Sequence, residues 1–304
     1  MQNRTTLGVF YLCLGIFVFS TQDAIIKAVS GDYALTEILA ARCLVSVPIL
    51  AVIVHYDVGL KALWSKNFWV LSARALIMFL AYTSYYMAFP ALPLADAVAL
   101  FFMVPLFTVA FASLFLNETI GWRRLLAVFV GFAGVIVMLR PGQGLFEPAA
   151  LLSLFSAATY ALSMVMARKL GTSEPASVMG FYQNGVYLTG AVAIVVFLKL
   201  FGIHEAVHPS LKFLVRDWTM PSLRDLALIA SCGVIAAVGV VLLTQAYRIA
   251  KASVVTSFEY TGMLWAPLWG FLFFNEIPHL TTIIGAALIV VAGLFALSGQ
   301  KEAG

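Results

Sequence analysis

The chain has 304 residues, of which 62% are hydrophobic and only 11% are charged, and its mean hydropathy is +1.00. Soluble domains average about 25% charged residues, so this composition excludes a soluble globular protein and indicates an integral membrane protein. The net charge of +4 comes from basic residues scattered between apolar runs, a pattern that does not indicate nucleic-acid binding.

Ten apolar segments are long enough to cross a bilayer, whose hydrocarbon core of about 30 Å needs roughly 20 apolar residues per helix. The first begins after Arg4, is too long for a signal-peptide core and is retained as a helix. The connections are short, except for 202–223, where a short surface helix or strand is expected. The predicted helices cover residues 7–28, 35–55, 68–89, 94–115, 123–139, 149–167, 176–201, 224–247, 252–274 and 280–298.

One stretch of the chain is repeated: Leu94–Glu118 has a second copy at Ala252–Glu276. Both copies are apolar, both contain a proline, and both end in Asn-Glu. We therefore expect an all-α membrane protein built from two related halves, 7–139 and 149–298, joined by a linker at 140–148. Because each half has five helices, an odd number, the second half enters the bilayer inverted, as in many transporters.

Lys and Arg residues near the helix ends predict the orientation in the membrane. With the N-terminus in the cytoplasm, ten of these residues lie near cytoplasmic ends and six near outer ends, four of the six within 199–224. We therefore expect a multi-pass protein of the inner (plasma) membrane with both termini in the cytoplasm.

Several features occur together: the duplication, Pro105 ahead of LFLNE, the second LFFNE, Arg42 in an AAR context, and glycine-spaced fifth and tenth helices. Over nearly the whole chain, this combination resembles the EamA-type members of the drug/metabolite transporter superfamily. The resemblance implies a ten-helix exporter of amino acids and related metabolites. It also implies a central path between helices one, three, four, six, eight and nine. Pro267 departs from the pattern, because it lies nearer its Asn-Glu pair than Pro105 does to the first.

Polar and aromatic side chains at membrane depth are the candidates for substrate binding. Tyr82 and Tyr85 share one face of the third helix, where a ring with a polar tip suits either a wet cavity or helix packing. Glu259 beside aromatic rings suits a substrate ammonium or a coupling proton. The side-chain amides of Asn184 and Gln245 suit either substrate binding or a hydrogen bond between helices. The predicted substrate-binding set is Tyr82, Tyr85, Phe101, Tyr160, Asn184, Gln245, Glu259, Tyr260 and Trp265.

Ionisable groups inside a membrane are costly and usually pair or face an aqueous cavity. Helix depth places Arg42 with Asp23 or Asp96 near the outer end, and Arg74 with Glu259 near the cytoplasmic end. These two clusters are interpreted either as gates that close alternately or as static ion pairs.

Other short patterns are interpreted as structural. Asn117-Glu118 and Asn275-Glu276 each precede a helix, where Asn can cap and the acid can face the helix N-terminus. Small residues allow helices to approach closely. They form a stripe on the sixth helix and recur on the fifth and tenth helices, at Ser153, Ser156, Ser163, Gly131, Gly134 and Gly285.

The sequence contains no Walker A loop, GxSG elbow, HExxH motif or clustered Cys and His residues, so neither an enzyme nor a cofactor or metal site is expected. The predicted function is a secondary carrier that exports small metabolites, in the first place amino acids, through a central cavity by alternating access. Its partners are a small-molecule substrate and membrane lipid, with a coupling proton and the oligomeric state left open. The alternatives are a carrier of nucleobases, drugs or other organic cations, and a membrane-embedded receptor or structural protein.

Overall fold

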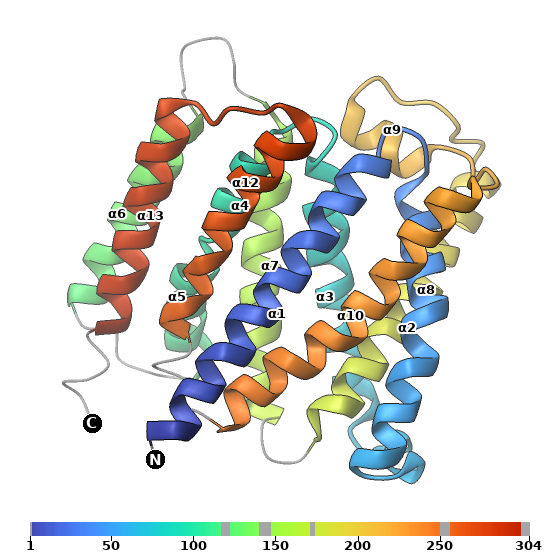
Figure 1. The fold of residues 1–304 in the computed structure, drawn as a ribbon, viewed down its shortest axis with the longest axis horizontal. Coiled ribbons are helices and arrows are strands. Elements are labelled where there is room, and N and C mark those ends of the chain that lie inside the picture. The colour runs from blue at the N-terminus through green and yellow to red at the C-terminus, as the bar shows by residue number, and fades with distance from the viewer. Residues whose placement is uncertain (1, 117–121, 140–146, 171–173, 250–255, 299–304) are drawn as a thin grey trace.

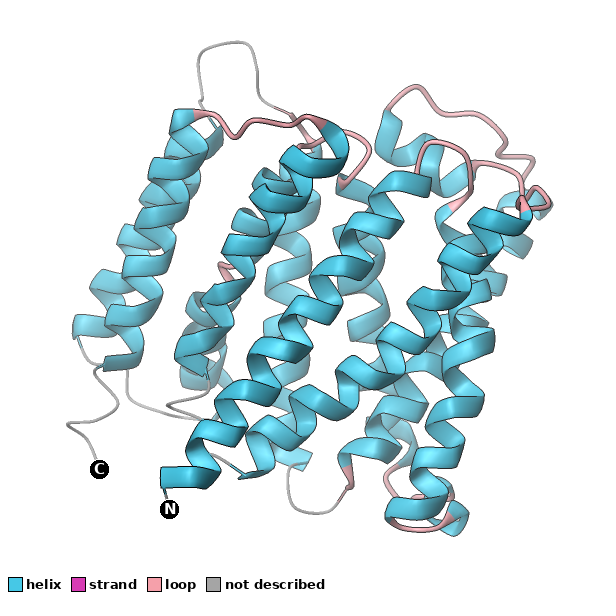
Figure 2. Ribbon diagram, in the orientation of Figure 1, coloured by secondary structure: helices cyan, strands magenta, loops and turns pink. Residues whose placement is uncertain are grey.

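The structure is a computed structural model that describes residues 2–116, 122–139, 147–170, 174–249 and 256–298. All regular structure in these ranges is helical, with no strand (Figure 2). The α-helices are α1 (Gln2–Val29), α2 (Leu35–Asp57), α3 (Phe68–Ala88), α4 (Leu94–Phe101), α5 (Val104–Leu116), α6 (Trp122–Leu139), α7 (Ala149–Leu170), α8 (Ala176–Leu200), α9 (Pro209–Val215), α10 (Leu223–Ile249), α12 (Gly262–Phe274) and α13 (Leu280–Ser298). Two 3₁₀ helices are η1 (Leu60–Leu63) and η2 (Thr256–Thr261).

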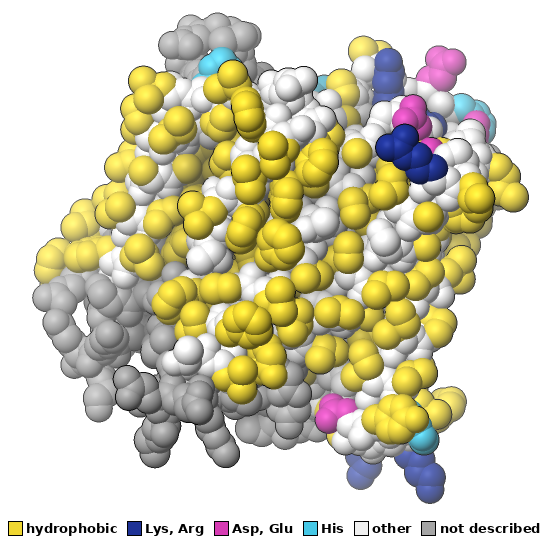
Figure 3. Space-filling model, in the orientation of Figure 1, with side chains coloured by type: hydrophobic (Ala, Val, Ile, Leu, Met, Phe, Trp, Pro, Cys, Tyr) yellow, Lys and Arg dark blue, Asp and Glu magenta, His cyan; other side chains and the backbone are white. Residues whose placement is uncertain are grey.

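The length and composition of the helices suit a membrane. Within the described ranges, 6 helices are long and apolar enough to cross a bilayer: α1, α2, α3, α7, α8 and α10. Large apolar side chains such as Leu44, Val192 and Phe197 remain exposed on the outside of the bundle. Hydrophobic side chains cover the middle of the face in Figure 3, whereas charged side chains gather near its two ends. A surface of this kind is stable in contact with lipid rather than water.

Two of the predicted helices are divided in the structure. The predicted helix 94–115 consists of α4 and α5, separated by a turn at Phe102 and Met103. Pro105 lies in the first turn of α5, where its missing N–H group is tolerated, but it prevents a continuous helix through this point. The expectation of one unbroken helix was therefore wrong here.

The second break lies in the repeated stretch at 252–274, and it is placed differently. There η2 gives way to α12 at Gly262, and α12 then runs through Pro267. Residues 252–255 lie outside the described ranges. The two copies therefore bend at different points relative to Pro105 and Pro267. The long connection 202–223 holds the short helix α9, as expected.

The helices pack in pairs that are far apart in the sequence. Helix α1 packs on α10 and α12, α2 on α8 and α10, α3 on α7 and α8, and α4 on α7 and α12. The first residues of α1 and the last residues of α13 lie at the same end of the bundle (Figure 1). The course of the chain is therefore consistent with both described ends lying on the same side of a membrane.

Helices α6 and α13 form a separate pair at the edge of the bundle (Figure 1). A Cβ atom on Gly134 would lie 2.7 Å from the carbonyl oxygen of Gly285, and one on Gly285 would lie 2.6 Å from that of Gly134. Only glycine permits this approach of two backbones, so the small residues bring these two helices into close contact. Gly131 instead faces Leu106 of α5.

Candidate functional site

A cavity of about 150 Å³ lies in the centre of the bundle, between α1, α3, α4, α5, α7, α10 and α12. Each water molecule needs about 10–15 Å³ of such space, so roughly ten waters fit, equivalent to about 300 Å³ of liquid. This is the lower end of the usual range for ligand sites, about 300–1,000 Å³.

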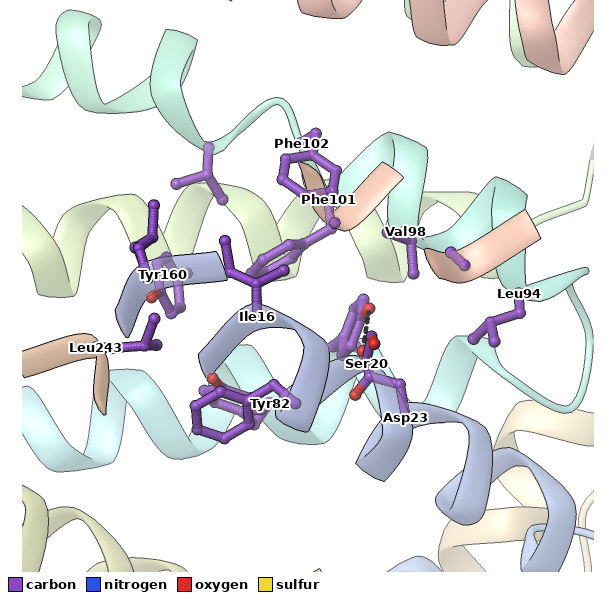
Figure 4. Close-up of a pocket in the computed structure, with 16 residues that line it drawn as sticks. Ile16, Ser20, Asp23, Tyr82, Leu94, Val98, Phe101, Phe102, Tyr160 and Leu243 are labelled. Atoms are coloured by element: carbon purple, nitrogen blue, oxygen red, sulfur yellow. Dashed lines mark hydrogen bonds between the residues drawn. The ribbon is translucent and has the colours of Figure 1, made fainter. Parts of the chain in front are cut away.

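An aromatic wall surrounds the cavity. The ring centroids of Tyr85 and Phe101 lie 4.8 Å apart, those of Phe101 and Tyr160 lie 5.3 Å apart, and those of Tyr82 and Tyr160 lie 6.2 Å apart. These four side chains come from α3, α4 and α7 and converge on one space (Figure 4). Their contacts cross between helices, and the three-residue spacing of Tyr82 and Tyr85 puts both on the same face of α3.

Asp23 of α1 also lines the cavity. Its Oδ2 accepts a hydrogen bond from the hydroxyl of Tyr85 at 3.1 Å, drawn as a dashed line in Figure 4. Ser20, one turn earlier on α1, accepts a hydrogen bond from Nε1 of Trp269 on α12 at 3.0 Å. The polar edge of the cavity is thus built on one face of α1.

Next to Asp23, a buried polar cluster joins four helices. The amide oxygen of Gln22 accepts hydrogen bonds from Nη1 of Arg42 at 3.2 Å and from the hydroxyl of Tyr86 at 2.7 Å. Its nitrogen donates to the carbonyl oxygen of Cys232 at 3.0 Å. Arg42 also lies over the ring of Tyr187, 5.5 Å from its centroid. Arg42 is within electrostatic range of Asp23, and its direct contacts include Gln22 and Tyr187.

A second charged group closes one end of the bundle. Nζ of Lys27 lies 2.6 Å from Oε1 of Glu276 and donates to the carbonyl oxygen of Leu92 at 2.7 Å. The other carboxylate oxygen of Glu276 accepts a hydrogen bond from the backbone N–H of Leu94 at 2.8 Å. We call Lys27, Glu276 and these two backbone groups the Lys27 latch. It ties α1 to the start of α4 and to the end of α12.

The latch corrects part of the structural interpretation of Asn275-Glu276. Asn275 ends α12 in a left-handed conformation, with φ 52°, rather than capping the next helix. Glu276 does face a helix N-terminus, but that of α4, about half the chain away, rather than that of α13. Asn117-Glu118 lies outside the described residues.

Two other predicted ionisable residues, Asp96 and Arg74, have different neighbours. Asp96 accepts a hydrogen bond from Thr282 of α13 at 2.7 Å, which ties α4 to the peripheral pair. Arg74 is buried on α3, within electrostatic range of Tyr160 and Tyr187. The side chain of its predicted partner, Glu259, lies outside the described residues, so their pairing stays a prediction.

The remaining predicted binding residues divide into two groups. Asn184 bonds Ser46 of α2 at 2.8 Å and joins α2 to α8 without lining the cavity. Tyr260 lies against Phe102, with centroids 5.7 Å apart, and Trp265 against Phe17, at 4.9 Å. They therefore lie beside the cavity on η2 and α12. The side chain of Gln245 lies outside the described residues.

The serine stripe of α7 packs tightly. Ser153, Ser156 and Ser163 have no exposed surface, and within the described part of the chain their hydroxyls have no hydrogen-bond partner. Helix α7 packs closely on α3. The stripe therefore acts through small size, whereas Tyr160 reaches the cavity.

Sequence reasoning missed three residues with clear roles in this region: Ser20, Gln22 and Lys27. Each makes a contact with a residue distant in sequence. The sequence indicates Lys27 only as one of the six basic residues near outer helix ends. The only sequence signal for Ser20 and Gln22 was their position on the same helix as Asp23.

Comparisons with known proteins find a family of transporters, related transporters and a solved structure of similar fold. The model of the EamA-like transporter family matches residues 6–140 and 147–298. An S-adenosylmethionine uptake transporter of Rickettsia bellii is 26% identical, over 98% of this chain and 96% of that one. A pseudopaline exporter of Pseudomonas aeruginosa is 30% identical, over 97% of each chain. A solved crystal structure superposes with a TM-score of 0.62 at 17% identity, covering 99% of both chains, which indicates a shared fold.

Proposed function

The chain belongs to the EamA-like transporter family, whose members are transporters and not enzymes, and from this premise we propose that it carries amino acids or closely related metabolites by alternating access. It is a multi-pass membrane protein and a transporter of small molecules. The observation that carries the proposal is the central cavity, which lies deep in the bundle and is lined by residues of both predicted halves.

The packing pattern supports the inverted repeat on which alternating access depends. If α1 corresponds to α7, α2 to α8, α3 to α10, α4 and α5 to η2 and α12, and α6 to α13, the contacts map onto one another. Under this correspondence the packed pair α1–α10 becomes the packed pair α7–α3, and α2–α10 becomes α8–α3. The pairs α2–α8, α4–α12 and α6–α13 each become themselves. Two halves related in this way can exchange conformations, which would open the cavity first to one side and then to the other.

The substrate class is supported by size and by the relatives. A volume equivalent to about 300 Å³ of liquid suits an amino acid. S-adenosylmethionine, which the relative from Rickettsia bellii takes up, is itself an α-amino acid. One of the two relatives imports and the other exports, so gradients rather than the fold set the direction. We propose export across the plasma membrane, with both termini in the cytoplasm.

Counterflow in proteoliposomes tests the carrier. Vesicles loaded with one unlabelled amino acid should accumulate its radiolabelled form transiently and saturably, and competition among amino acids should identify the preferred one. Tyr82→Ala, which removes part of the cavity wall, should raise KM about tenfold. Tyr56→Ala, at a side chain that is 83% exposed and outside the cavity, is the matched control and should leave KM unchanged.

The outcomes separate the alternatives. Exchange of nucleobases or other organic cations, with amino acids inactive, would keep the carrier and change its cargo. A protein that exchanges none of these compounds would contradict the carrier and favour a receptor or structural role.

A further inference from the structure

We propose that Asp23 is the anchor for a cationic centre of the substrate, an ammonium or similar group attached to an apolar body. This inference rests on the proposed carrier function and names the chemistry that the cavity selects. It gives Asp23 a role in ligand binding in place of the gate or ion pair expected from the sequence.

The first argument is the charge of the cavity. Among its described lining residues Asp23 is the one carboxylate, and none is Lys or Arg. An ionised carboxylate inside a membrane is costly unless it is paired or solvated. A ligand with a positive group beside Asp23 therefore gains more than a neutral ligand of the same shape.

The second argument is the geometry of the carboxylate. Oδ2 accepts the hydrogen bond from Tyr85, and within the described part of the chain no donor reaches Oδ1. Asp23 is only half-buried, and the surface that it exposes faces the cavity, which has room for a ligand (Figure 4). Tyr85 thus fixes the carboxylate and leaves one oxygen for a bound group.

The third argument is the wall around the carboxylate. The faces of aromatic rings attract cations, and here rings from α3, α4 and α7 enclose the space next to Asp23: Tyr82, Tyr85, Phe101 and Tyr160. The same rings contact an apolar body. An anion in this space would instead meet the carboxylate of Asp23.

Arg42 does not occupy this site. It contacts Gln22, it is not a lining residue, and it is 3% exposed. It lies within electrostatic range of Asp23 without filling the position of the ligand.

The test compares two ligands that differ by one charged group. L-phenylalanine methyl ester carries an ammonium, and methyl 3-phenylpropanoate is the same molecule without it. Choline and 3,3-dimethyl-1-butanol form a second such pair. Binding of all four to the purified full chain in nanodiscs is measured by calorimetry at pH 7 for the wild type, Asp23→Asn and Asp23→Glu.

The wild type should bind at least one ammonium compound about tenfold or more tightly than its neutral partner. Asp23→Asn keeps an oxygen that can accept the hydrogen bond from Tyr85 but loses the charge, so it should fold normally and lose the preference. Asp23→Glu should retain part of it. Equal binding of charged and neutral partners, a preference that survives in Asp23→Asn, or no binding by either ammonium compound would overturn the inference.

Counterflow by the same variants separates this inference from the carrier function. A wild type without saturable exchange would contradict the carrier. A wild type that exchanges substrate, together with an Asp23→Asn variant of unchanged KM and unchanged charge preference, would leave the carrier intact and remove Asp23 from it.

Discussion

Helices α1 and α7 both line the central cavity, but they are held in place by different forces. Helix α1 reaches its neighbours through directional polar contacts, from Ser20 to α12, from Gln22 to α2, α3 and α10, and from Lys27 to Glu276. Helix α7 presents three buried serines that make no such contact within the described part of the chain. In the proposed repeat these two helices are equivalent, so one helix of an equivalent pair can be held by polar contacts and the other by close packing.

The difference indicates that α1 and α7 have separate roles at the cavity. Polar contacts can be exchanged one for another when helices move, whereas close packing of small residues is lost when helices separate. Helix α1 therefore supplies the charge of the cavity and the latch at one end, and α7 supplies a fixed wall. Four substitutions, taken from the largest expected effect to the smallest, test this contrast.

Gln22→Leu should have the largest effect. The change removes the acceptor that faces Arg42 and leaves a guanidinium buried among apolar groups, and hydrogen bonds to charged groups contribute about 1.5–3 kcal/mol. We expect a loss of about 2–3 kcal/mol in stability, seen as a lower melting temperature in detergent. Gln22→Glu, which keeps an acceptor for Arg42, is the control. A Gln22→Leu protein as stable as the wild type would show that the cluster does not hold α1.

Breaking the Lys27 latch should come next. Its two side chains are 10% and 24% exposed, so the pair lies between exposed and fully buried cases, and we expect a coupling on the order of 1–2 kcal/mol. Lys27→Met and Glu276→Gln should each increase the labelling rate of a cysteine introduced at Leu94. The double variant should add little to either single one. Fully additive rates would mean that the two residues act independently.

Ser20→Ala should have a smaller effect on α1. It removes the acceptor for Trp269, and hydrogen bonds between helices in membranes average about 0.6 kcal/mol. We expect a loss of about this size, together with a change in tryptophan fluorescence because the indole loses its partner. An unchanged emission spectrum would argue against the bond.

Ser156→Ala on α7 should have the smallest effect. Its hydroxyl is buried without a partner in the described part of the chain, so we expect a change within about 0.5 kcal/mol, of either sign. Ser156→Leu is the size control and should cost about 1–3 kcal/mol, because the added atoms have no space against α3. If alanine were as harmful as leucine, α7 would depend on polar contacts after all.

Much of the fold could be predicted from the sequence because apolar length and Gly-Pro punctuation act locally. The predicted segments match α1, α2, α3, α6, α7, α8, α10 and α13 to within a few residues, apart from five at the start of α1. The breaks in the repeated stretch were less predictable. Pro105 indicates a weak point, but the turn at Phe102 and Met103 depends on packing against α7 and α12 as well.

The site was predictable where a pattern lies on a single helix. The spacing of Tyr82 and Tyr85 predicted a shared face, and both line the cavity together with Phe101 and Tyr160. Their role in binding stays a prediction. Contacts between distant segments could not be predicted, because nothing in the local sequence pairs Lys27 with Glu276 or Gln22 with Arg42.

The glycine contact between α6 and α13 has a consequence for biosynthesis. The ribosome produces α6 well before α13, yet the nearest atoms to Gly134 belong to α13 and those to Gly285 belong to α6. Until the second glycine emerges, α6 stays in the lipid with its close-contact face uncovered. A chain cut before residue 280 would therefore leave this face of α6 without its partner helix.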